Sequence, residues 1–144
     1  MNRRTVALLF MTMLLSLGFA GTALASNKPL VIYFEKDCPA FTCAETAASP
    51  VDVDTAITSG WLSGYVFHYT ATETVSSAAG SVTLDLAGVL MLHRNPNLTI
   101  LHGTVTSGSW NGVDLTGAQV HASAVRVTGT IFAGWVQIMP ASAG

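Results

Sequence analysis

One carboxylate and one group of basic residues in this sequence are candidates for acid–base catalysis or ligand binding. The first is Glu73, which follows a stripe of aromatic residues at alternate positions in the segment GWLSGYVFHYTATETV, residues 60–75. At the end of an apolar interior, a carboxylate of this kind would serve as a general base or as a polar anchor for a ligand. A solvated carboxylate near a strand end is the alternative, because Glu is usually exposed in proteins.

The group of basic residues contains His93, Arg94 and His102. The turn RNPN, residues 94–97, would bring two strands side by side and place both histidines near one end of a sheet. Acid–base catalysis or metal binding needs at least two such groups, with a carboxylate, at one point. These three residues therefore form a possible polar cluster, and partly exposed histidines with ordinary hydrogen bonds are the alternative.

The sequence predicts neither a metal site nor a cofactor, and it identifies no catalytic residue. The histidines lack HxH or HxxxH spacing, and the motifs GxSxG, HExxH, GxGxxG and the P-loop are absent from the sequence. We therefore favour a protein without catalytic function, with an enzyme as the alternative.

The aromatic stripe is the candidate ligand-binding site. Its members share one face if the segment is a single strand: Trp61, Tyr65, Phe67 and Tyr69, followed by Glu73. Large flat side chains with one polar group suit the packed core of a barrel, and they also suit binding of a small apolar molecule. We expect this stripe to face inward, to fill most of the interior, and to leave a small pocket near Glu73.

Cys38 and Cys43, in the segment CPAFTC, are the two cysteines of the chain. In an exported protein this spacing predicts a disulfide that closes a small loop over residues 38–43. A redox pair or a metal site is the alternative, but redox centres use tighter CxxC spacing and a metal would need further ligands.

The sequence predicts that these residues lie on β-strands. Apolar residues come in alternating runs bounded by Gly, Asn and Ser, and apolar stripes of helical period are missing almost everywhere. The segment 43–60 is the most loop-like part of the chain and is expected to form an excursion. Strands are expected at residues 29–35, 62–74, 81–93, 98–106, 118–127 and 131–139, with short additional ones near 55–59 and 110–115.

Short, turn-like connections between these strands predict antiparallel neighbours. A meander of long twisted strands tends to close on itself, which removes exposed edges. The predicted fold is all-β: a single antiparallel up-and-down β-barrel, with a two-sheet β-sandwich as the alternative. A transmembrane β-barrel is a less favoured alternative, because long polar loops are lacking and the chain ends in MPASAG and not in a strand with a terminal aromatic residue.

The first residues predict export. Residues 1–25 combine Arg3 and Arg4, an apolar run, and small residues before a cleavage site, as a signal peptide does. Residues 26–144 are then a single domain of a secreted or periplasmic protein, with no stable membrane anchor after cleavage. An uncleaved anchor is the alternative, and the paired arginines leave the general and the twin-arginine export routes both open.

Charge and hydropathy bear on the partners. After residue 25, four basic residues remain against eight acidic ones, a net charge of −4 with neutral histidines. Nucleic-acid binding is therefore not expected, because phosphate recognition needs a basic face. Both faces of the segment IFAGWVQIM, residues 131–139, are apolar. Part of the outer surface is expected to be covered by the N-terminal segment, by a second copy in a homo-oligomer, or by a partner.

Three segments of the chain carry a resemblance to known proteins: FHYTATETVSSAAGSVTLDLAGVL, GTVTSG and the ending from LTGAQVHASA to GTIFAGWVQIMPASAG. Over residues 65–144, the chain resembles a group of small exported bacterial proteins without an assigned function. In strand layout and Gly-rich turns, that group is similar to the allene oxide cyclase and dirigent type of β-barrel. The resemblance implies the barrel fold, and barrels of this type include binding proteins and isomerising enzymes alike.

Three functions are consistent with these observations. The favoured one is an exported barrel that binds a small apolar ligand or a protein partner without catalysis. The first alternative is an isomerase or cyclase acting on an apolar substrate, with Glu73 and a histidine as its polar groups. The second is an oligomeric surface-interaction module.

Overall fold

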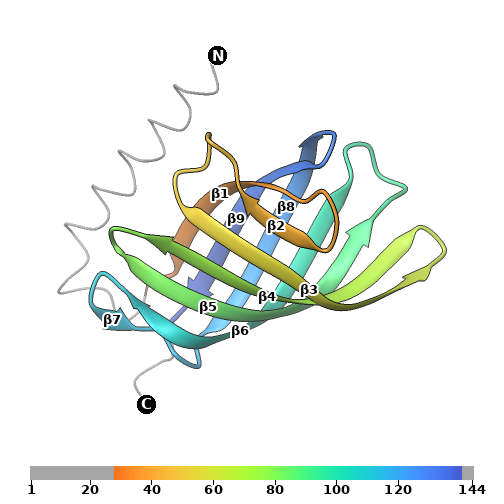
Figure 1. The fold of residues 1–144 in the computed structure, drawn as a ribbon. Coiled ribbons are helices and arrows are strands. Elements are labelled where there is room, and N and C mark those ends of the chain that lie inside the picture. Colours follow the sequence, from red (N-terminus) through yellow and green to blue (C-terminus); the bar gives the residue numbers. More distant parts are fainter. Residues whose placement is uncertain (1–27, 141–144) are drawn as a thin grey trace.

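The computed structural model describes residues 28–140, which form a β-barrel without a helix (Figure 1). In this part of the chain, accordingly, no helix could cross a membrane. The predicted signal peptide, residues 1–25, lies outside the described residues. The strands are β1 (Leu30–Asp37), β2 (Thr42–Glu45), β3 (Asp52–Ser63), β4 (Val66–Ser77), β5 (Gly80–Met91), β6 (Leu98–Trp110), β7 (Val113–Asp114), β8 (Gln119–Thr128) and β9 (Ile131–Met139).

Eight of these strands form a closed ring in the order β5-β4-β3-β2-β1-β9-β8-β6, and β5 pairs with β6 to complete it. Every pairing is antiparallel, and β7 pairs with β6 outside the ring. Strands that are neighbours in the ring are also joined by short connections along the chain, except β1 and β9, which are the first and last strands. The prediction of an up-and-down β-barrel is therefore confirmed.

One predicted strand is instead a hairpin. The alternation predicts a single strand at residues 62–74, but the chain turns at Gly64 and Tyr65, between β3 and β4. Gly64 has a φ of 59°, which a two-residue hairpin loop needs at its first position and which glycine adopts without strain. Because of this turn, Trp61 pairs with His68 and does not continue the face that carries Phe67.

The segment 43–60, predicted to be a loop-like excursion, contains most of β2 and most of β3. Along β3 the buried residues Val53 and Thr55 alternate with the exposed residues Asp52 and Asp54. This alternation is the ordinary signal of a half-buried strand. The small and acidic residues on its outer side made the segment look like a loop.

The two ends of the barrel differ in the side chains that fill the interior. At the end formed by the connections 46–51, 78–79 and 111–118, which we call the closed end, aliphatic residues of the ring strands point inward. Trp110 and Leu115 are buried there as well and belong to the same apolar cluster. The inward aliphatic residues of this end are Ile32, Val53, Val75, Val82, Leu84, Val105, Val120, Val136 and Ile138.

Candidate ligand-binding site

The opposite end of the barrel, which we call the open end, contains a cavity of about 230 Å³. This end carries the loops 38–41, 64–65, 92–97 and 129–130. Most of the cavity wall is apolar, and the polar groups are few. The apolar residues of its wall include Phe34, Phe67, Ala71, Leu86, Leu90, Leu101 and Phe132.

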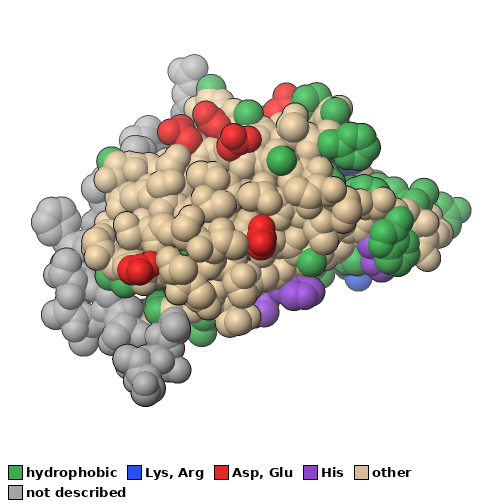
Figure 2. Space-filling model, turned by 60° about the horizontal axis from the view of Figure 1, so that its bottom comes forward, with side chains coloured by type: hydrophobic (Ala, Val, Ile, Leu, Met, Phe, Trp, Pro, Cys, Tyr) green, Lys and Arg blue, Asp and Glu red, His purple; other side chains and the backbone are tan. Residues whose placement is uncertain are grey.

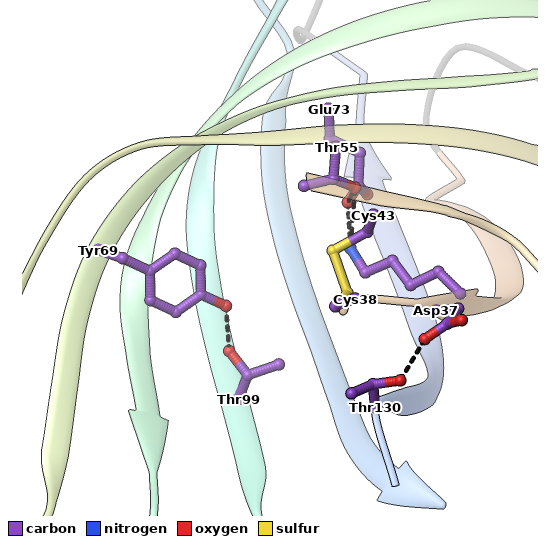
Figure 3. The surroundings of a disulfide bond; sticks show 9 residues. Asp37, Cys38, Cys43, Thr55, Tyr69, Glu73, Thr99 and Thr130 are labelled. Atoms are coloured by element: carbon purple, nitrogen blue, oxygen red, sulfur yellow. Dashed lines mark hydrogen bonds and ion pairs between the residues drawn. A yellow bond between two sulfur atoms is a disulfide. The ribbon is translucent and has the colours of Figure 1, made fainter. Parts of the chain in front are cut away.

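A buried ion pair between Lys36 and Glu73 forms part of the cavity wall, with side chains 9% and 1% exposed. Lys36 Nζ also donates to Thr55 Oγ1 at 3.2 Å, and Thr55 Oγ1 donates to Glu73 Oε2 at 2.7 Å (Figure 3). Lys36 points inward because it shares the face of β1 that carries Ile32 and Phe34. Apolar residues in place of a buried ion pair are often neutral or stabilising, so packing alone does not explain this pair.

A second polar group in the wall is the phenol of Tyr69, whose hydroxyl is hydrogen-bonded to Thr99 Oγ1 (Figure 3). Thr99 Oγ1 donates its one proton to the carbonyl of Val89 at 2.9 Å, so Tyr69 is the donor to Thr99. Burial raises the pKa of Tyr69 to about 12; the bond to Thr99 lowers this pKa and the charge of Glu73 raises it. Tyr69 is therefore a neutral phenol at neutral pH.

Arg126 supplies a third polar group. Its Nη1 donates to the carbonyl of Gly129 at 2.6 Å, and its guanidinium lies 5.1 Å from the ring centroid of Phe132. Its Nε is buried and has no hydrogen-bond partner within residues 28–140. A buried donor without a partner is costly. Arg126 thus brings the positive charge of its guanidinium to the cavity wall, while its Nε is out of reach of water.

Cys38 and Cys43 lie at disulfide distance, with their Sγ atoms 2.07 Å apart, as the spacing predicts. Both residues border the cavity, together with Ala40 and Phe41 from the loop between them. The disulfide therefore ties the start of β2 to the end of β1 at the mouth of the cavity (Figure 3). Its role in this fold is to hold a short loop over the open end.

The residues of the aromatic stripe are not all in one place. Phe67, Tyr69 and Glu73 border the cavity as expected. The expectation that Trp61 and Tyr65 face inward with them is wrong, since these side chains are 60% and 72% exposed. The turn at Gly64 separates them from the inner face of β4, and Trp61 stacks on His68 with ring centroids 3.9 Å apart.

The predicted cluster of His93, Arg94 and His102 does not form. His93 and Arg94 lie in the loop after β5, while His102 lies in β6 opposite Ala87. The neighbour of His102 on the other side is His121 of β8, and both histidines are exposed on the outer wall. Within the described range, no three His, Cys, Asp or Glu residues are arranged to hold a metal ion.

Sequence reasoning missed Lys36, Thr55, Thr99 and Arg126 as members of the site. For Lys36 a signal was present, since a lysine in line with Ile32 and Phe34 is unusual on an apolar strand face. For the threonines no signal existed, because Thr is common on either face of a strand. Their convergence depends on which strands face each other across the barrel.

Taken together, the site is an apolar cavity bordered by a buried ion pair, a neutral phenol and the guanidinium of Arg126. Such a wall can enclose an apolar molecule and orient it through one or two hydrogen bonds. No protein-family model matches the chain, and neither a curated protein nor a solved structure matches it. The resemblance to the allene oxide cyclase and dirigent type of barrel therefore stays a prediction.

Proposed function

We infer that this protein binds a small apolar molecule inside the open end of its barrel, without catalysis. The observation that carries this inference is the cavity of about 230 Å³ bordered by the buried pair of Lys36 and Glu73. An engineered apolar cavity of roughly 150 Å³ accommodates benzene. The cavity of this barrel should therefore accommodate a ligand of about ten non-hydrogen atoms.

The charges in the cavity wall indicate which polar group the ligand carries. The charges of Lys36 and Glu73 compensate each other, whereas Arg126 has no carboxylate partner among the described residues. The cavity wall is left with one positive charge, that of Arg126. We therefore assign the ligand to small apolar molecules with an oxygen acceptor, of which a medium-chain carboxylate is the best match.

Octanoate and octylammonium test this assignment, because they share an alkyl chain and differ in the charge of the head group. Isothermal titration calorimetry at neutral pH should show saturable binding of octanoate, at least tenfold tighter than binding of octylammonium. In Arg126→Gln this preference should fall to less than threefold. No saturable octanoate binding by the wild-type barrel would overturn the assignment.

A second pair of variants tests the location. Ala71 lies between Tyr69 and Glu73 on the inner face of β4 and borders the cavity. Ala71→Leu should fill the cavity beside the ion pair and weaken octanoate binding at least tenfold. Ala56→Leu is the matched control, because Ala56 is exposed on β3. Equal affinities of the two variants would show that the ligand binds elsewhere.

A further inference from the structure

Large apolar side chains are exposed around the mouth of the cavity. Two of them lie at the end of β3, just before the turn of the β3–β4 hairpin, one lies in that turn, and the others lie in loops 38–41 and 92–97. Figure 2 shows hydrophobic side chains gathered at the end of the molecule where this hairpin protrudes. We call this set the mouth rim: Phe41 (67% exposed), Trp61 (60%), Leu62 (61%), Tyr65 (72%) and Leu92 (40%).

The rim is a preformed surface. The amide of Leu92 donates to the carbonyl of Tyr65 at 2.8 Å, which joins the loop after β5 to the hairpin turn. The indole of Trp61 is held by its stacking on His68, with an angle of 7° between the rings. Exposed apolar side chains held in one arrangement mark an interaction site in soluble proteins.

Charge is distributed unevenly between this end and the rest of the protein. The described residues carry eight carboxylates and four Lys or Arg residues, a net charge of −4. At the open end, by contrast, lie Arg94 in loop 92–97, Arg126, which is bonded to Gly129, and Asp37, which is bonded to Thr130, a net charge of +1. The acidic side chains visible in Figure 2 lie away from the hairpin tip. An acidic protein thus presents an apolar end with a positive charge.

We propose that the mouth rim docks reversibly on a lipid surface that contains anionic lipids. Trp and Tyr prefer the boundary between lipid and water, and Leu and Phe add apolar area that inserts below the head groups. Arg94 complements anionic head groups, and the acidic outer walls stay on the water side. The carboxylates on the outer walls would be repelled by anionic head groups, which disfavours docking through those walls.

The rim is continuous with the cavity, which strengthens the assignment to lipid over a protein partner. Phe41 belongs both to the rim and to the cavity wall, and Ala40 beside it is also exposed and borders the cavity. An apolar ligand has low solubility in water and is concentrated in a lipid phase. Docking through the rim would place the opening of the cavity against that phase.

Vesicle sedimentation tests the proposal with the detergent-free protein. The wild-type protein should sediment with vesicles of phosphatidylcholine and phosphatidylglycerol, and more weakly with phosphatidylcholine alone. The triple variant Trp61→Ser, Leu62→Ser, Tyr65→Ser should lose at least tenfold in partitioning. Arg94→Gln should lose about fivefold on anionic vesicles and little on neutral ones.

The matched control is the double variant Ile100→Ser, Trp135→Ser, which removes apolar side chains that are 48% and 36% exposed on the outer wall. It should sediment like the wild-type protein. Ala71→Leu should also sediment normally, which separates this proposal from the proposed ligand binding. The proposal is overturned by absence of sedimentation, by equal losses in rim and wall variants, or by rim variants that only dissociate an oligomer in size-exclusion chromatography.

Discussion

The closed end and the open end of the barrel are built from the same eight strands but are filled differently. At the closed end, aliphatic side chains such as Val75, Leu84 and Ile138 have no exposed surface. At the open end, an ion pair, a phenol and a guanidinium border a cavity. The difference indicates that the closed end contributes most of the packing stability, whereas the open end leaves the space that the proposed ligand would occupy.

The largest expected effect concerns the ion pair. Glu73→Leu leaves the charge of Lys36 buried without its partner and should lower the free energy of unfolding by about 3–5 kcal/mol. The double variant Lys36→Met, Glu73→Leu should recover most of this loss, because no charge then remains buried. Urea unfolding measures the free energy of unfolding of the single and the double variant. A double variant as unstable as the single one would mean that the pair itself stabilises the fold.

A pair of identical truncations compares the two ends directly. Leu84→Ala, at the closed end, should lower the free energy of unfolding by about 2–5 kcal/mol, because it removes contacts and opens a new void. Leu101→Ala, in the cavity wall, should cost about half as much, since one side of Leu101 already borders empty space. Equal losses in urea unfolding would argue against the distinction between the ends.

The smallest effect is the pH dependence due to Tyr69. Its pKa of about 12 in the folded protein exceeds the ordinary value of 10.0, so the unfolded chain loses the phenol proton first as the pH rises. The free energy of unfolding is unaffected by this group below about pH 9 and should fall by about 1 kcal/mol at pH 11.

Tyr69→Phe is the control for this titration. The variant keeps the ring in the cavity wall and removes the group that titrates, so the difference in stability between it and the wild-type protein should be constant below about pH 9 and change above it. A constant difference up to pH 11 would show that the open end does not shield the phenol from water.

The fold was largely predictable from the sequence, because strand alternation and short turns are local signals. The turn at Gly64 was missed because GWLSGYVF keeps an apolar alternation through it, and only the φ of the glycine reveals the hairpin. Strand β3 was missed at its start because Asp52 and Asp54 gave it the composition of a loop.

The site was predictable only where its residues lie on one strand. Phe67, Tyr69 and Glu73 belong to β4, so their shared face could be read from spacing. Lys36 and Arg126 reach the same cavity from β1 and β8. Lys36 and Arg126 come together because of the pairing register between the strands of the closed ring. No short segment of the sequence encodes this register.

Closure of the ring also constrains the order of folding. The barrel is sealed where β1 pairs with β9, the first and last strands of the described chain. The β3–β4–β5 meander can form early from local contacts, but the seam joins segments from opposite ends of the sequence and pays a large loop-closure entropy. The barrel interior therefore cannot close until synthesis has delivered β9, and the chain that emerges before then must remain incompletely folded.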